Sequence, residues 1–347
     1  MNLTGYNGLH RFAAVVQLPQ WNVLKVSGRH RERWLQGMIT QDIKSLPDKG
    51  RRYGCIVNVK GRVFCDFYIY NSVADDAYFM VMQSERIDPT IEHLGNFIIS
   101  ERVTLENMSK EFNILTIQGP EAASLLNDPQ HDFSEFSITH SLGECRALVM
   151  RHSRVGNDGF DILIPVDREA SVYGQESSDS FDSAIDWQEY QLAEQGAEKT
   201  DEAILNVVRV EAAIPAYDSE MAQGVFPQEA CLTDALHWTK GCYVGQEVVA
   251  RLEHRGHTNR ELRQITIDTD TAVSADAKLF APDNLNKVVG WIYSNVWSPS
   301  GETVLALAMI RRAHFESGTR LICIDGERQC DAVVTDRSIR GHKKTAA

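Results

Sequence analysis

The chain has 347 residues, enough for two or three domains with sizeable cores. Its formal net charge is −13, from 35 Lys and Arg against 48 Asp and Glu. That balance argues against a sequence-independent grip on nucleic acid, which needs a basic face. No apolar run approaches the ~18 residues of a membrane span, and the first ten residues do not resemble a signal peptide, so we expect a cytoplasmic globular protein.

Strands and helices alternate in the N-terminal part. We predict a strand over 21–26, followed by a helix that begins at Arg31, and then a hairpin over 53–70 with its turn at Lys60-Gly61. Further elements are predicted at Tyr78–Met82 (strand), Ile87–Ser100 (helix), Phe112–Ile117 (strand), Glu121–Leu126 (helix), Cys145–Val149 (strand) and Phe160–Ile164 (strand).

Asp66 stands in the second strand of the predicted hairpin. Alternation places it on one face with Phe64 and Tyr68, opposite a face formed by Val63, Cys65, Phe67 and Ile69. A carboxylate in an otherwise apolar strand is costly unless it is paired or faces a cavity. Asp66 is therefore a candidate site residue, and exposure at a sheet edge is the alternative.

The middle of the chain contains an acidic insertion at about 167–202, rich in Asp, Glu, Ser and Gln. We expect 173–186 to be an exposed loop or a disordered insertion, and a charge run of this kind indicates solvated surface rather than chemistry. Helical periodicity returns over 203–213, and Pro215 is expected to end that helix.

The last part of the chain predicts an all-β domain. Short strands are expected at Leu262–Ile267, Lys278–Ala281, Val288–Tyr293, Thr303–Ile310, Arg320–Ile324 and Asp331–Val334, a spacing that suggests a small barrel or sandwich. The polar loop that contains His254 and His257 marks the boundary. A glycine separates these histidines and no third ligand is evident, so we expect no metal site.

The seven cysteines include no CxxC pair. Their number and spacing argue against a disulfide framework, a zinc ribbon and a self-contained iron–sulfur cluster.

The eight residues 240–247, KGCYVGQE, bring together an amine, a thiol, a phenol, an amide and a carboxylate, with two glycines. They lie between a short strand expected at 235–239 and a helix or second strand expected at 248–252. Lys240 stands two residues before Cys242 and can lower the pKa of its thiol, because a nearby cation favours the thiolate. The alternative is a sharp turn whose cysteine is simply buried.

This segment resembles the KGC[FY]xGQE signature of the folate-binding YgfZ family, which shares the fold of the glycine-cleavage T-protein, an aminomethyltransferase. Besides Lys240 and Cys242, the matching positions are Gly241, Tyr243, Val244, Gly245, Gln246 and Glu247. Two further segments, RVEAAIP over 209–215 and PQE over 227–229, are also similar to that family, and the resemblance covers about residues 20–335.

The resemblance implies a folate site. It places Tyr53 in the folate pocket and Glu211 on the pterin, whose N3–H and 2-amino group can donate two parallel hydrogen bonds to one carboxylate. Arg209 then balances either Glu211 or the glutamyl tail of the substrate. Tyr217 and Trp238 are candidate flat partners for the aromatic rings, although core packing is the favoured interpretation for Trp238.

Two positions depart from the transferase pattern. The strand that resembles GGxxDDL has Cys65 in place of its first acid, next to Asp66, and the loop at 156–159 has Asn157 where the transferases carry Glu. Both departures weigh against aminomethyl transfer.

The resemblance thus implies an α+β protein with two interleaved folate-binding lobes over 1–255 and a C-terminal β-barrel over 256–347. It implies tetrahydrofolate-dependent support of iron–sulfur cluster assembly or repair in client proteins, indirectly including radical enzymes that modify tRNA. Cys242 is the expected nucleophile, and Cys231 can approach it. The alternatives are a tetrahydrofolate-dependent aminomethyl- or methyltransferase and a non-catalytic adaptor for cluster-assembly proteins.

Overall fold

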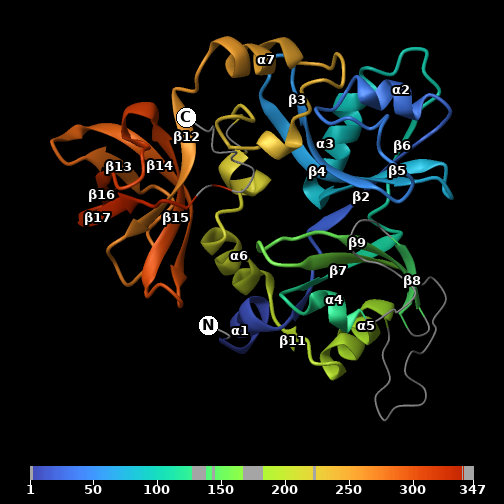
Figure 1. Ribbon diagram of the computed structural model, residues 1–347, viewed down its shortest axis with the longest axis horizontal. Helices are drawn as coiled ribbons and strands as arrows, with labels where there is room; N and C mark the ends of the chain where they lie inside the picture. The colour runs from blue at the N-terminus through green and yellow to red at the C-terminus, as the bar shows by residue number, and fades with distance from the viewer. Residues whose placement is uncertain are drawn as a thin grey trace. The chain divides into compact units, whose positions relative to one another are not determined.

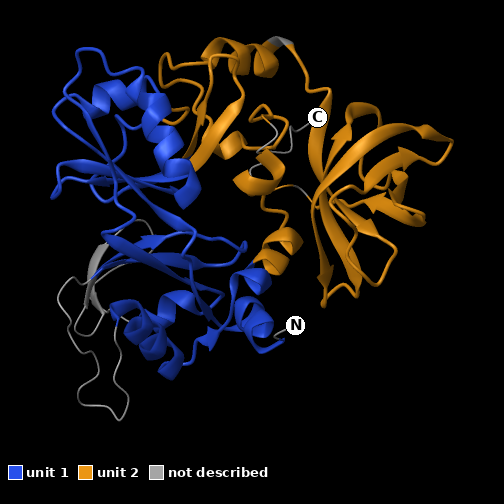
Figure 2. Ribbon diagram, turned by 180° about the vertical axis from the view of Figure 1, so that it is seen from behind, with its two compact units in different colours: residues 1–38, 42–53, 67–205 blue, residues 39–41, 54–66, 206–347 orange. Residues whose placement is uncertain are grey.

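The computed structural model describes residues 3–126, 138–142, 145–166, 183–221, 224–337 and 339. The chain forms two compact units (Figure 2). Unit 1 comprises Met1–Met38, Asp42–Tyr53 and Phe67–Leu205; unit 2 comprises Ile39–Gln41, Gly54–Asp66 and Asn206–Ala347. Each unit is therefore built from segments far apart in the sequence.

A six-stranded sheet in unit 1 has the order β11-β1-β7-β10-β9-β8. Figure 1 labels four of these strands, β7, β8, β9 and β11. Its strands are β1 (Ala14–Gln17), β7 (Phe112–Gln118), β8 (Ile138–Leu142), β9 (Cys145–Arg151), β10 (Gly159–Pro165) and β11 (Glu198–Lys199). Strand β10 is buried along nearly its whole length, as expected for a central strand. Helices α4 (Ala122–Leu125) and α5 (Ala184–Glu194) contribute to the apolar core of this sheet.

A five-stranded sheet has the order β3-β4-β5-β2-β6. Its strands are β2 (Trp21–Ser27), β3 (Arg51–Val57), β4 (Val63–Ser72), β5 (Ala77–Gln83) and β6 (Thr104–Asn107), and the remaining helices of unit 1 are α1 (Leu3–Arg11), α2 (Arg31–Gln36) and α3 (Ser84–Gly95). The hairpin β3–β4 turns through Asn58–Arg62, as predicted. Burial alternates along the first half of β4, with Cys65 and Phe67 buried and Asp66 and Tyr68 half-buried.

Unit 2 contains a closed barrel of six antiparallel strands in the order β12-β15-β14-β13-β16-β17. These are β12 (Arg260–Ile267), β13 (Lys278–Ala281), β14 (Asn284–Ser298), β15 (Thr303–Arg311), β16 (Arg320–Asp325) and β17 (Arg328–Val334). Helices α6 (Glu202–Glu211) and α7 (Gln246–Arg255), a π-helix η1 (Tyr217–Met221) and the 3₁₀ turns η2 (Thr233–Ala235) and η3 (Arg312–His314) complete the described elements. The predicted α+β class with a C-terminal barrel is confirmed.

Four local predictions were wrong. No strand forms over 235–239: η2 ends at Ala235, the His237 N–H donates to the Thr40 carbonyl, and the Thr40 hydroxyl donates to the Ala235 carbonyl. Helix α3 begins at Ser84 and ends at Gly95, three and five residues earlier than predicted. Helix α6 ends at Glu211, before Pro215, and Ala213 adopts a positive φ of 53°. Residues 184–194 form α5, which Ser183 caps by accepting the Asp186 N–H.

Residues 167–182 of the acidic insertion and the basic tail at 340–344 lie outside the described residues. Among the helices that the structure does describe, none is long and apolar enough to cross a membrane.

Candidate functional site

The KGCYVGQE loop packs against the β3–β4 turn through a glycine. Gly245 has φ +81° and directly precedes α7. A Cβ at this position would lie 2.4 Å from the carbonyl oxygen of Asn58 and 2.8 Å from Cγ2 of Val57. Glycine is therefore required here both by the backbone conformation and by the lack of space.

Lys240 and Tyr243 fix the start of the loop from within. Both side chains are buried, and the Lys240 ammonium donates a 2.7 Å hydrogen bond to the carbonyl of Ile39. The same ammonium lies 4.9 Å from the ring centroid of Tyr243, a cation–π contact. Burial, followed by the charge of Cys55, raises the pKa of the Tyr243 phenol. Activation of Cys242 by Lys240 stays a prediction.

Cys242 is exposed, so the alternative of a buried cysteine is wrong. It follows Gly241, which has φ +99° and open space where a Cβ would stand. The loop thus presents a thiol to solvent from a backbone that is anchored on both sides.

The remaining motif residues begin helix α7. Gln246 is half-buried and donates its backbone N–H to the carbonyl of Tyr243. Glu247 is exposed and pairs with Arg251 one turn later, at 2.6 Å. This exposed i,i+4 pair stabilises the helix by only a few tenths of a kcal/mol, roughly.

Cys231 is held elsewhere by the barrel. Its thiol is buried and donates to Glu261 at 3.5 Å and to the carbonyl of Leu262 at 3.7 Å. Burial, followed by the charge of Glu261, raises the pKa of this thiol well above its ordinary value. An approach of Cys231 to Cys242 stays a prediction, and in this conformation Cys231 is a protonated core residue.

Arg209 joins α6 to η1 and β14. Its guanidinium donates to the Asn206 side chain, to the Ile214 carbonyl, to Glu220 at 3.1 Å and to Ser294 at 2.9 Å. Five hydrogen bonds match the five donors of an arginine. The carboxylate that Arg209 balances here is thus Glu220, which neither of the two sequence-based alternatives named.

Glu211, the predicted pterin ligand, lies at the end of α6 and is 7% exposed. Its Oε1 accepts hydrogen bonds from Ser298 at 2.5 Å and from Ser300 at 3.3 Å. The Gln264 side chain donates to the backbone carbonyl of Glu211. The carboxylate is therefore held by hydroxyl groups, which can rotate to share it with a further donor.

Two further carboxylates of unit 2 were not predicted as site residues. Glu220 is fully buried, and its Oε1 has no hydrogen-bond partner within the described part of the chain. Glu229, from the PQE segment, accepts from Arg260 at 3.0 Å and from Arg62 at 3.3 Å. The PQE resemblance was a signal for Glu229, whereas nothing in the pattern singled out Glu220.

The predicted ring partners are both accessible. Tyr217 is half-buried in η1. Trp238 is 38% exposed and makes an edge contact with His254, so its interpretation as core packing was wrong. Contact of either ring with a folate stays a prediction.

In the hairpin β3–β4, Asp66 differs in burial from Cys65 and Cys55. Asp66 is half-buried, whereas Cys65 and Cys55 are fully buried. Burial raises the pKa of the Cys55 thiol to about 12, and the charge of Asp66 adds to this effect. The two residues of the Cys65-Asp66 pair thus face opposite sides of β4.

Tyr53 belongs to an aromatic series in unit 1. Its ring centroid lies 4.9 Å from that of Tyr68, which in turn lies 3.9 Å from that of His152. Asp161 is bonded to His152 Nδ1 at 2.7 Å and to the Arg154 guanidinium by two bonds of 2.8 and 2.9 Å. This buried His–Asp–Arg group was not predicted from the sequence.

Asn157, the second departure from the transferase pattern, lies in the loop between β9 and β10. Its side-chain amide donates to the carbonyl of Leu9 at 3.0 Å. In unit 1 this residue therefore makes a structural contact.

Over the described residues, no group of three or more His, Cys, Asp or Glu is arranged to hold a metal ion.

Comparison with known proteins gives relatives over nearly the whole chain. The chain is 22% identical to an aminomethyltransferase of Caldanaerobacter subterraneus subsp. tengcongensis, over 99% of its own length and 89% of the relative. It is also 22% identical to an aminomethyltransferase of Thermoanaerobacter pseudethanolicus, over 99% and 90%. The glycine cleavage system aminomethyltransferase T of Bartonella henselae has the same fold, with a TM-score of 0.82, 17% identity and coverage of 98% and 90%.

The family model of the GCVT N-terminal domain matches residues 9–240, which is most of the chain and includes the α6 motif. Its match ends at Lys240, the first residue of the KGCYVGQE loop. The chain therefore belongs to the GCVT N-terminal domain family.

Proposed function

We propose that the chain binds tetrahydrofolate and works on, or together with, its one-carbon unit. The observation that carries this proposal is the family match over 9–240, a region that contains Tyr53, Asp66 and Glu211. The buried carboxylate of Glu211, held by two rotatable hydroxyls, suits the hydrogen-bond donors of a pterin.

Aminomethyl or methyl transfer is the first candidate reaction. Both curated relatives named above are aminomethyltransferases. One departure from the transferase pattern, Cys65 in place of an acid, argues less strongly against transfer once the burial of β4 is considered. Cys65 is fully buried on the face opposite Asp66, so its replacement of an acid leaves the carboxylate on the half-buried face in place. Asp66 would then accept a proton from a folate nitrogen.

A second candidate is support of iron–sulfur proteins, as the resemblance to the YgfZ family implies. The exposed Cys242 on its anchored loop favours it, because an accessible thiol can reach a cluster or a partner protein. In this function tetrahydrofolate would be bound, the partners would be client or assembly proteins, and any effect on tRNA would be indirect. A non-catalytic adaptor would use the same loop as a contact surface.

Turnover separates the two candidates. Purified chain would be mixed with tetrahydrofolate and an S-aminomethyl thiol (R–S–CH2–NH2) as the donor, and the release of methylenetetrahydrofolate, ammonia and the free thiol would be measured. Transfer chemistry predicts turnover that Asp66→Asn reduces by at least 100-fold or so, the usual order for loss of an acid–base group. Asp283→Asn, an exposed aspartate in unit 2, is the matched control and should keep full turnover.

Absence of turnover, with cluster-repair activity that Cys242→Ser abolishes, would favour the second candidate. Activity retained in Cys242→Ser would contradict a thiol mechanism and favour the adaptor. A wild-type chain that does not bind tetrahydrofolate would contradict the proposal as a whole.

A further inference from the structure

Two cysteines of the barrel lie opposite each other on neighbouring strands. β16 and β17 are antiparallel, and their register pairs Cys323 directly with Cys330. Residues paired in this way point to the same face of the sheet and have Cα atoms roughly 4.5–5.5 Å apart. Disulfides span Cα separations of about 4.4–6.8 Å, so the spacing of the two strands is compatible with a bond between these cysteines. Both thiols are free in the structure.

The two thiols differ in access. Cys323 is fully buried in the barrel core, whereas Cys330 is half-buried and packs against the same core. Burial raises the pKa of the Cys323 thiol to about 11, and the charge of Cys330 is the next cause, which agrees with the two sulfurs being close. An incoming reagent can therefore reach Cys330 first, and Cys323 is placed to react with it afterwards.

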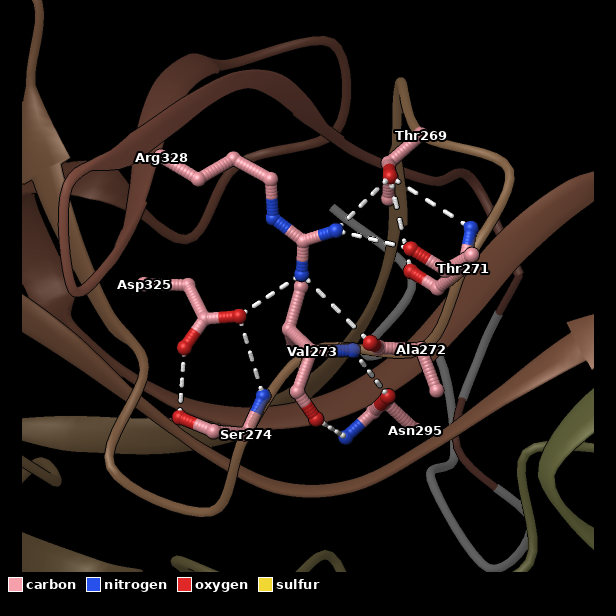
Figure 3. Close-up of polar contacts among 8 residues, drawn as sticks. All are labelled: Thr269, Thr271, Ala272, Val273, Ser274, Asn295, Asp325 and Arg328. Carbon is pink, nitrogen blue, oxygen red and sulfur yellow. Dashed lines mark hydrogen bonds and ion pairs between the residues drawn. The ribbon is translucent and has the colours of Figure 1, made fainter.

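The turn that joins the two strands is held by a polar clamp, shown in Figure 3. Arg328 pairs with Asp325 across the turn at 2.6 Å and donates to Thr271 at 2.8 Å. Asp325 also accepts from both the backbone N–H and the hydroxyl of Ser274. The hairpin end is thus bound to the segment 269–274.

That segment is bound in turn to β14. The side chain of Asn295 accepts from the N–H of Val273 at 2.9 Å and donates to its carbonyl at 3.1 Å (Figure 3). The clamp therefore connects the end of the β16–β17 hairpin to a third strand of the barrel. A hairpin fixed in this way keeps its register, and hence keeps Cys323 opposite Cys330.

We propose that Cys323 and Cys330 form a reversible dithiol–disulfide couple that exchanges with low-molecular-weight disulfides. Cys330 loses its proton to the solvent and its thiolate attacks one sulfur of the small disulfide, whose S–S bond breaks and releases a small thiolate that takes up a proton. Cys323 loses its proton to the solvent and attacks the Cys330 sulfur, which releases the second small thiol. The chain loses two electrons and two protons, and the small disulfide gains both. The couple is independent of Cys242 and of folate.

The test uses the full chain with Cys242→Ser, which removes the exposed thiol. This protein would be incubated under native conditions with oxidised glutathione, alkylated, digested with trypsin without reduction and analysed by mass spectrometry. Trypsin cleaves after Arg320, Arg328 and Arg337, so Cys323 and Cys330 fall in separate peptides. We expect these peptides, 321–328 and 329–337, to be recovered joined, and to separate after reduction.

Two further variants report the order of the steps. Adding Cys323→Ser should leave a stable glutathione adduct on Cys330, because no second thiol is present to displace it. Adding Cys330→Ser should abolish both the joined peptides and any adduct on Cys323. The proposal would be overturned by an adduct on Cys330 that persists while Cys323 is present, by joined peptides that appear only after denaturation, or by the absence of any reaction at either thiol.

Discussion

At Asp161, two nitrogen-bearing side chains converge on one buried carboxylate in unit 1. Arg154 supplies a bidentate ion pair and His152 a single hydrogen bond. Burial lowers the pKa of His152 to about 4, although the charge of Asp161 acts in the opposite direction. The charge of Arg154 and the bonds from its neighbours hold the pKa of Asp161 below its ordinary value despite burial. In the native chain the imidazole is thus neutral at pH 7.

This arrangement predicts a loss of stability in mild acid. An unfolded His152 takes up its proton near pH 6.5, and the folded one only near pH 4. Between these values the unfolded state binds more protons, so stability rises with pH and is lost as the pH falls from 6.5 to 4. The contribution is at most about 3 kcal/mol.

Urea unfolding of the wild type and His152→Gln across this pH range would measure that contribution. The variant should show a flatter pH profile, and His257→Gln, which changes an exposed imidazole, should keep the wild-type profile. An unchanged slope in His152→Gln would mean that other groups carry the acid sensitivity.

The element that positions Cys242 is the loop between η2 and α7, with a glycine at each side of the motif centre. Gly241 and Gly245 both have positive φ, but only Gly245 lies against a neighbouring backbone. Lys240 holds the loop from its first position by its bond to the Ile39 carbonyl. The thiol is therefore presented by a short, well-anchored segment of unit 2.

Alanine substitutions at Gly241 and Gly245 distinguish the cost of backbone strain from the cost of a steric clash. Gly241→Ala should cost only about 1–2 kcal/mol for an L-residue at positive φ. Gly245→Ala carries the same strain and in addition places a methyl group 2.4 Å from the Asn58 oxygen, so it should lower the free energy of unfolding by clearly more. Chemical denaturation of the two variants measures the difference. Equal losses would show that the loop does not pack closely on the β3–β4 turn.

On the scale of the whole molecule, the barrel is the part of unit 2 that is most self-contained. Its apolar core comes entirely from residues between Ile265 and Val334, and closure leaves the strands without free edges. Outside the barrel, residues 206–255 of the same unit bond to it, as in Arg209 with Ser294 and Glu229 with Arg260.

The proposed domain boundary at 255/256 can be tested with fragments. We expect 256–347 to unfold cooperatively on its own, because its core is complete, and 206–347 to be more stable because it restores the ion pairs to the barrel. Thermal unfolding followed by circular dichroism measures both. A fragment 256–347 without a cooperative transition would contradict the proposed boundary.

Much of the fold was predictable because local patterns specify it. The alternation around Asp66 and the turn at Lys60-Gly61 were visible in the residues themselves, and so was the spacing of the six barrel strands. The exposure of Trp238 was not predictable, because an indole occurs both in cores and at surfaces and the residue pattern does not distinguish the two.

The ion pairs were the main features that sequence reasoning missed. The pairing of Arg209 with Glu220 was missed because Glu220 comes from a π-helix, a rare element without a recognisable pattern. His152 and Arg154 meet Asp161 through the register of β9 with β10, and register depends on tertiary contacts. In the same way, the pairing of Cys323 with Cys330 follows from strand register and not from cysteine spacing.

Calorimetric titration of tetrahydrofolate into wild type and Glu211→Gln tests most directly whether the pterin binds to Glu211. We expect the wild type to bind tetrahydrofolate. The variant should lose on the order of 1.5–3 kcal/mol of binding free energy, as for a hydrogen bond to a charged group. Glu316→Gln, an exposed glutamate of the same unit, should bind like the wild type. Unchanged affinity in Glu211→Gln, with a loss in Glu220→Gln instead, would contradict the assignment of the pterin to Glu211.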